Sequence, residues 1–188
     1  MTTSRRTGQL PLPFGDVFRG PPYRMDKSGT RIVRVATEQD LELIRTLFLE
    51  YARSLDFDLN FQRFDTEMET LPGNYATPRG LLLLAMDGET AAGCVAVRRY
   101  KPGICEMKRL YVRSKYRGRR IGRRLAEAVL EEAAKLGYRS MRLDTVPAMA
   151  RALALYTDLG FEPIAAYCHN PIPGALFLEC RLAPGERV

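Results

Sequence analysis

Apolar residues along the chain follow two periods, which together predict an alternating series of strands and helices. Spacings of three and four residues predict helices after Thr37, over Phe61–Leu71, from Ile121 to Leu136 and over Ala148–Leu159. Alternating or continuous apolar runs predict strands over Arg31–Ala36, Leu81–Ala85, Ala91–Tyr100, Ile104–Val112, Arg139–Asp144, Phe161–Ala165 and Ala175–Leu182. The predicted order is β-α-α-β-β-β-α-β-α-β-β, which is typical of a mixed α/β domain.

Local signals fix several of the predicted boundaries. Thr37 and Asp40 have the spacing of a helix N-cap and its capping box. Asp87-Gly88 predicts a hairpin turn. Gly137 follows the third helix, where glycine is favoured because it adopts the left-handed conformation that ends a helix.

Residues 1–29 differ from the rest of the chain. They contain four prolines and four glycines and show neither a helical nor a strand period. We expect a flexible N-terminal extension over 1–29 and a single domain over 30–188. No apolar run approaches the roughly 18–20 residues of a membrane span, and no signal peptide is apparent.

The composition narrows the class of protein further. The four cysteines lack metal-ligand spacing, and at least three of them lie in predicted strands as small apolar residues. Reduced thiols of this kind suit the cytoplasm, which is the expected location. The sequence shows neither a Ser/His/Asp set nor a cluster of metal ligands, so no metal is expected.

The strongest local signal is a basic turn that leads from a strand into a helix. From Lys108 to Arg124 there are nine basic residues and no acidic one. These charges crowd a helix N-terminus, where cations are unfavourable and anions are favoured. Unpaired backbone N–H groups at such an end bind phosphate, and arginines add bidentate donors. The pattern therefore favours a phosphate-bearing ligand over a merely solvated basic face.

This turn resembles a motif of the GNAT superfamily of N-acetyltransferases. The family signature, Arg/Gln-x-x-Gly-x-Gly/Ala, is similar to Arg117-Gly118-Arg119-Arg120-Ile121-Gly122, with Arg120 standing where the family usually has glycine. Leu155-Tyr156-Thr157-Asp158-Leu159-Gly160-Phe161 is similar to the Leu-Tyr-x-x-x-Gly-Phe motif of the same family. Where the family commonly has Asn in the helix before this motif, the chain has Ala148 and Met149. The resemblance covers roughly residues 31 to 182.

The resemblance implies a fold and a cofactor. The implied fold is α/β (α+β): a mixed, mostly antiparallel sheet of six to seven strands, flanked by about four helices, whose central strands splay apart to hold acetyl-CoA. The cosubstrate acetyl-CoA would lie against residues of the basic turn, the preceding strand and the following helix. The implied cofactor-binding residues are Leu110, Tyr111, Val112, Arg117, Gly118, Arg119, Arg120, Ile121, Gly122, Arg123, Met149 and Ala152.

The resemblance also implies the chemistry. Glu106 occupies the place where many GNAT enzymes have a general-base Glu, and Tyr156 matches the general-acid Tyr position. Each also has a plain structural interpretation, as a strand-edge carboxylate and as a core tyrosine. A backbone N–H near Leu110 would polarise the thioester carbonyl, as an oxyanion hole does.

The acceptor and the partners follow less directly. The segment from Glu38 to Glu69 has nine acidic residues against three basic ones, which is typical either of solvated helix faces or of a rim that attracts a cationic amine. We expect a small-molecule or peptide amine as acceptor and no membrane partner. A non-catalytic acyl-CoA-binding or regulatory module of the same fold remains an alternative. Nucleic acid is disfavoured because few aromatics accompany the basic turn, and a homodimer is left open.

Overall fold

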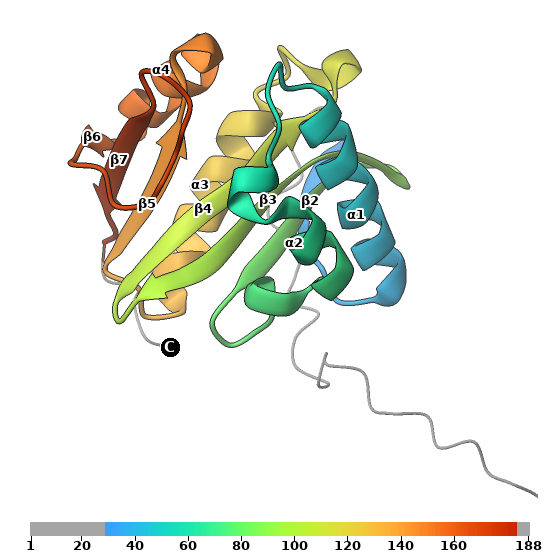
Figure 1. Cartoon of the computed structure of the whole chain (residues 1–188). Coiled ribbons are helices and arrows are strands. Elements are labelled where there is room, and N and C mark those ends of the chain that lie inside the picture. Colours follow the sequence, from blue (N-terminus) through green and yellow to red (C-terminus); the bar gives the residue numbers. More distant parts are fainter. Residues whose placement is uncertain (1–28, 184–188) are drawn as a thin grey trace, which may run out of the picture.

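The computed structural model describes residues 29–183, which form one seven-stranded sheet with helices on both faces (Figure 1). The strand order is β1-β2-β3-β4-β5-β7-β6. All neighbouring strands are antiparallel except β4 and β5, which are parallel. This is the mixed α/β fold expected from the sequence. The expected extension over 1–29 lies almost wholly outside the described residues.

The elements follow the predicted order. The strands are β1 (Thr30–Arg34), β2 (Leu81–Asp87), β3 (Thr90–Lys101), β4 (Ile104–Val112), β5 (Ser140–Thr145), β6 (Glu162–Pro163) and β7 (Leu176–Arg181). The helices are α1 (Glu38–Arg53), α2 (Phe64–Thr70), α3 (Ile121–Lys135) and α4 (Ala150–Asp158), with short 3₁₀ turns η1 (Asn60–Gln62), η2 (Gly73–Tyr75), η3 (Ser114–Tyr116) and η4 (Pro147–Met149). Within residues 29–183, no helix has the length and apolar character that crossing a membrane requires.

The sheet separates two hydrophobic cores. On one face, α1 packs its apolar stripe, including Ile44, Leu47 and Phe48, against β2 and β3. On the other face, α3 buries Leu125 and Val129 against the central strands. Figure 1 shows α1 and α2 on the near side of the sheet and α3 behind it. Two cores of this kind explain why β2 is apolar at almost every position.

The predicted caps are confirmed. The Thr37 hydroxyl accepts a hydrogen bond from the Asp40 N–H at 3.1 Å, and the Asp40 carboxylate accepts one from the Thr37 N–H at 3.1 Å. This reciprocal pair satisfies N–H groups that a helix leaves unpaired at its start. Gly137 has φ 86°, so it ends α3 in the left-handed conformation as expected.

Two helices are shorter than predicted. Arg63 has φ 58°, and this left-handed residue divides the expected helix over Phe61–Leu71 into η1 and α2. The helix expected over Ala148–Leu159 begins as η4, and the α-helical part starts at Ala150. In both places the hydrophobic period continues through the interruption, so the period alone could not locate it.

The central strands diverge where the site forms. Strands β4 and β5 pair over three positions, from Ile104 with Ser140 to Glu106 with Arg142. Beyond Glu106, the edge of β4 that faces β5 has no strand partner among the described residues. Arg109 has φ 58° and lies at a register shift between β3 and β4, which marks a β-bulge. The expected splay of the central strands is therefore present, and a bulge accompanies it.

Candidate active site

A small cavity lies where β4 and β5 separate. Its volume is about 40 Å³. Lys108, Arg109 and Leu110 of β4 line one side, and Leu143, Asp144 and Thr145 of β5 line the other, with Met107 at the base. Tyr51 of α1, Gln62 of η1, Met149 and Tyr156 complete the wall. Of the residues implied by the sequence, this cavity brings together Leu110, Met149 and Tyr156.

Tyr156 presents a hydroxyl for which the described residues supply no hydrogen-bond partner. The side chain is 7% exposed, and its ring packs against Phe161 with the ring centroids 5.7 Å apart. Among residues 29–183, no hydrogen bond to the Tyr156 hydroxyl is found. Burial, with smaller contributions from Tyr51 and Asp144, raises the pKa of this phenol above its usual value. The hydroxyl therefore remains protonated at neutral pH and is available as a donor.

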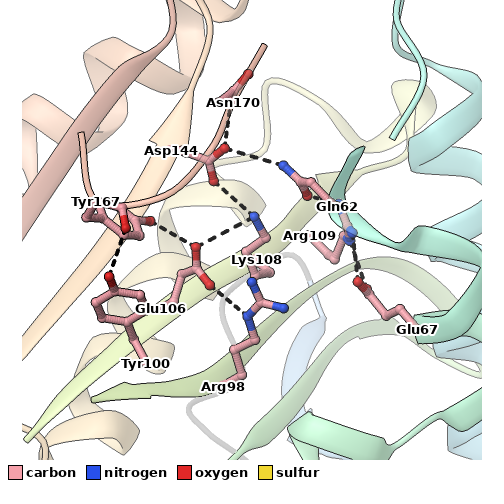
Figure 2. Close-up of polar contacts among 10 residues, drawn as sticks. All are labelled: Gln62, Glu67, Arg98, Tyr100, Glu106, Lys108, Arg109, Asp144, Tyr167 and Asn170. Atoms are coloured by element: carbon pink, nitrogen blue, oxygen red, sulfur yellow. Dashed lines mark hydrogen bonds and ion pairs between the residues drawn. The ribbon is translucent and has the colours of Figure 1, made fainter. Parts of the chain in front are cut away.

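Glu106 is buried away from the cavity lining. Glu106 has 1% of its surface exposed to solvent. One carboxylate oxygen accepts a hydrogen bond from Arg98 Nε at 2.7 Å, and the other accepts one from the Tyr167 hydroxyl at 2.9 Å and lies 3.8 Å from Lys108 Nζ (Figure 2). Burial and the Glu106 carboxylate raise the pKa of Tyr167 above its ordinary range. Any contact of Glu106 with a substrate in the cavity passes through one of these neighbours.

Lys108 and Asp144 were not recognised from the sequence as site residues, yet both line the cavity. Lys108 Nζ donates to Asp144 Oδ1 at 2.9 Å, and Asp144 Oδ2 accepts from Asn170 Nδ2 at 2.8 Å and from Gln62 Nε2 at 3.3 Å (Figure 2). Burial works to raise the pKa of Asp144, but the Lys108 ammonium and the Asn170 amide outweigh it and hold the pKa below its ordinary value. Asp144 is therefore ionised at neutral pH.

The bulge residue Arg109 joins the α1–α2 arm to β4. Its guanidinium makes a bidentate pair with Glu67, at 2.9 and 2.7 Å, and donates to the Gln62 side-chain oxygen at 3.0 Å. It also lies 5.1 Å from the ring of Phe64. These contacts anchor η1 and α2 over the gap, and they position Gln62 beside the cavity.

Three of the nine acidic side chains in the Glu38–Glu69 segment make partly buried internal contacts. Glu50 makes a bidentate pair with Arg113, and Glu67 pairs with Arg109. Asp40 caps α1. These carboxylates therefore do not add to a free acidic rim, and the carboxylate that reaches the cavity, Asp144, comes from β5 instead.

The basic turn contributes a helix end whose capping residue is itself cationic. Arg120 is the N-cap of α3, has φ 58°, and makes no side-chain cap hydrogen bond. Glycine adopts this left-handed conformation without strain, which accounts for the glycine that is usual at this position of the motif. A Cβ on Gly122 would approach Val112 Cγ2 at 3.7 Å, an ordinary contact, so the start of α3 has room beside it.

The arginines of the turn point in different directions. Arg117 Nε donates to the Val112 carbonyl at 3.1 Å from an exposed position. Arg123 pairs with Asp158 at 2.7 Å, which connects α3 to α4. The guanidinium of Arg119 contacts Asp87 and Thr30 on the β1–β2 side, so its contribution at the α3 end would come from its backbone.

The remaining residues implied by the sequence flank the gap. Tyr111 has its ring 6.0 Å from the ring of Tyr51, while Leu110, Val112 and Ala152 pack partly buried against the core that contains α3. Gly118 has φ 81° in the turn before α3, and Ile121 is buried at the helix start. Tyr111 therefore faces the core on the α1 side of the sheet, while Leu110 and Val112 face the core on the α3 side.

One group of side chains has the composition of a metal site. Ligand atoms of Glu106, Asp144 and Cys168 lie within 4.8 Å of one another. The Lys108 ammonium already lies against both carboxylates, at 3.8 and 2.9 Å, and supplies a cation there. Burial also raises the pKa of the Cys168 thiol to about 11, so it is a poor thiolate ligand at neutral pH. The group is better described as part of the Lys108 ion-pair network.

The fold and this site together define the class of protein. A mixed sheet with splayed central strands, a basic turn at the start of the third helix, and a tyrosine at the gap are features of acyl-CoA-dependent acetyltransferases. Residues 41–161 match the model of the acetyltransferase (GNAT) family. The chain belongs to this family, whose general activity is acyl-CoA-dependent acetyl transfer.

Known proteins agree with this assignment. An uncharacterized N-acetyltransferase of Schizosaccharomyces pombe is 40% identical over 161 residues, covering 85% of this chain and 99% of its own length. A GNAT-family acetyltransferase of Staphylococcus aureus has the same fold, with a TM-score of 0.68, 19% identity, and coverage of 82% of this chain and 99% of its own. A Salmonella typhimurium protein solved with its cofactor acetyl-CoA aligns with a TM-score of 0.59 and 17% identity, over 84% of this chain and 99% of its own.

Proposed function

We propose that the protein transfers an acetyl group from acetyl-CoA directly to a primary amine of a small molecule, an amino acid or a peptide. The observation that carries this proposal is the cavity at the β4–β5 gap. There the Tyr156 hydroxyl, for which residues 29–183 supply no hydrogen-bond partner, and the carboxylate of Asp144 line the same partly open space. Direct transfer needs both reactants in such a space, because alignment alone lowers the barrier substantially.

The chain offers a fit for acetyl-CoA at both ends of the gap. When bound, this cosubstrate supplies the acetyl group as a thioester. The α3 N-terminus offers backbone N–H groups for phosphate, supported by Arg117 and Arg120. The edge of β4 beyond Glu106 offers backbone groups that no strand of the described chain occupies. Leu110, Tyr111 and Val112 on this edge would pair with the amide groups of an extended arm.

Tyr156 is the proposed proton donor to the departing thiolate. Its hydroxyl is buried and protonated, it has no competing partner among residues 29–183, and it lines the cavity. The thiolate takes this proton as the bond between sulfur and the acetyl carbon breaks. A donor held in place by core packing against Phe161 needs little reorganisation at that moment.

Glu106 is the proposed final acceptor of the proton that the amine loses. Because its carboxylate does not line the cavity, the proton would reach it by way of Lys108, whose Nζ lies 3.8 Å from Glu106 Oε1. Lys108 would pass one proton to Glu106 and receive one from the amine side. Arg98 and Tyr167 hold the carboxylate oriented for this role.

Initial-rate kinetics with an accepted amine test direct transfer. Varying acetyl-CoA at several amine concentrations should give intersecting double-reciprocal lines, and intact-protein mass spectrometry should detect no acetylated enzyme when the amine is omitted. Parallel lines together with a stable acetyl-enzyme would overturn the direct mechanism and indicate a covalent intermediate.

The location remains an inference from the thiols. All four cysteines are free, and Cys94, Cys105 and Cys180 are buried. Buried reduced thiols suit a reducing compartment, so the cytoplasm is the proposed location.

A further inference from the structure

Asp144 is the single carboxylate among the described residues that line the cavity. It lies two positions beyond the last pair that joins β4 to β5, so its strand has already separated from β4. Its side chain is 4% exposed, and it faces the same space as Tyr156. An amine that reached the acetyl group through this cavity would meet the Asp144 carboxylate on its way.

Donors from three separate segments hold the carboxylate in place. Lys108 belongs to β4, Asn170 to the loop between β6 and β7, and Gln62 to η1 (Figure 2). Burying an ionised carboxylate costs free energy unless it is paired and hydrogen-bonded. Lys108 is the nearest counter-ion of Asp144, at 2.9 Å, and lies farther from Glu106, at 3.8 Å, whose other oxygen pairs with Arg98. The network therefore holds Asp144 ionised at a cavity wall that Lys108 and Arg109 also line.

Of the three donors to Asp144, Gln62 is the one that an incoming ammonium could replace. The bond from Gln62 Nε2 to Asp144 Oδ2 is 3.3 Å long, against 2.9 Å for Lys108 and 2.8 Å for Asn170. Gln62 is a neutral donor on the short turn η1, and its side-chain oxygen accepts from Arg109. A charged ammonium makes a shorter and roughly twofold stronger hydrogen bond to a carboxylate than a neutral amide does. An ammonium could thus displace Gln62 with a net gain.

We propose that Asp144 binds the acceptor's ammonium group and selects amines that are protonated at neutral pH over neutral isosteres. This inference rests on the proposed amine acetyltransferase function and names the feature of the acceptor that the site recognises. An amine held at Asp144 would lie in the cavity that Tyr156 also lines. Asp144 would then be a specificity-determining residue, which also contacts Lys108 on the proposed proton path to Glu106.

Asp144→Asn preserves the shape of the side chain and removes its charge. For an accepted alkylamine we expect KM to rise about 10- to 100-fold, in line with a charge-assisted hydrogen bond. Affinity for acetyl-CoA, measured by calorimetry, should stay within about twofold because the α3 end is untouched. Asp144→Glu, which retains the charge, should recover part of the loss.

Glu179→Gln is the matched control. Glu179 is a partly buried carboxylate on β7 that does not line the cavity. It pairs with Arg142 of β5, the strand that also carries Asp144. Its removal should leave the acceptor KM unchanged. Equal increases in KM for Asp144→Asn and Glu179→Gln would show that loss of a β5 ion pair, and not loss of an ammonium contact, produces the effect.

A comparison of a charged and a neutral ligand tests the proposal by binding, first on the wild-type protein and then on Asp144→Asn. An accepted alkylamine is compared with the alcohol of the same carbon skeleton as a competitive inhibitor. We expect the alcohol to bind at least tenfold more weakly than the amine, and Asp144→Asn to abolish the difference. Equal binding to wild type would overturn the ammonium contact while leaving acetyl transfer intact. Absence of turnover with every amine would instead count against the proposed function itself.

Discussion

Replacing Tyr156 by Phe removes the one group on which the proposed departure of the thiolate depends. The ring stays in place against Phe161, and the lost hydroxyl has no hydrogen-bond partner among the described residues. The free energy of unfolding should therefore change by no more than about 0.5 kcal/mol. Turnover should fall by about 10²- to 10⁴-fold, as expected for loss of a general acid. That factor corresponds to about 3 to 5 kcal/mol in the activation free energy.

The chain contains a matched control for this substitution. Tyr138 is also buried, but its hydroxyl donates to the Arg79 carbonyl at 2.6 Å, away from the cavity. Tyr138→Phe should lower the free energy of unfolding by about 1 kcal/mol and leave turnover unchanged. Tyr156→Phe is therefore predicted to lower kcat with little change in stability, and Tyr138→Phe to lower stability with no change in kcat.

The assay combines thermal melting, acetyl-CoA calorimetry and release of free CoA thiol at saturating amine. Tyr156→Phe should bind acetyl-CoA as wild type does and melt at the same temperature, while kcat falls. Full activity in Tyr156→Phe would refute the proton-donor role. An equal fall in kcat for Tyr138→Phe would show that the assay reports on packing and not on the hydroxyl.

Three further predictions concern the cofactor end, Glu106 and acid stability. Gly122→Glu should abolish measurable acetyl-CoA binding by calorimetry, whereas Gly122→Ala should bind normally because a Cβ meets Val112 at an ordinary 3.7 Å; equal affinities would refute the phosphate site. Glu106→Gln should keep acetyl-CoA affinity and lose about 10²- to 10⁴-fold in kcat; an unchanged pH–rate profile would assign the proton to water or another carboxylate. Asp144 has a folded-state pKa below its ordinary value of 3.8, so its contribution to stability is present above that value and is lost as the pH falls through the lower folded-state pKa. The free energy of unfolding, measured by chemical denaturation from pH 5 to 2, should therefore decline more steeply for wild type than for Asp144→Asn. Identical slopes would contradict the lowered folded-state pKa of Asp144.

The sequence was sufficient for the fold because each element has its own local signal. The apolar stripe of α1 and the continuous apolar run of β2 reflect burial on fixed faces, and both recur in the structure. The exceptions include the interruption of the second predicted helix at Arg63 and the conformation of Arg120 just before α3. Arg63 and Arg120 adopt a left-handed conformation that is normally signalled by glycine or asparagine, so residue type gave no warning.

The site was only partly predictable, for a different physical reason. Tyr156 and the turn around Gly122 belong to short motifs that can be recognised locally. Lys108 and Asp144 become site residues only because η1 and the loop after β6 fold over the gap and bury them. In the strand pattern Asp144 alternates with the inward-pointing Leu143 and so resembles an ordinary exposed residue. Its position at the end of the fifth predicted strand, next to the gap, was the one available signal.

Mass spectrometry of an amine panel incubated with acetyl-CoA tests the central claim most directly. Wild-type protein should add one acetyl group to the nitrogen of at least one primary alkylamine, amino acid or peptide and release an equal amount of CoA. Gly122→Glu should give no product. A protein that binds acetyl-CoA tightly in calorimetry but acetylates no member of the panel would contradict the account and indicate a non-catalytic acyl-CoA-binding module.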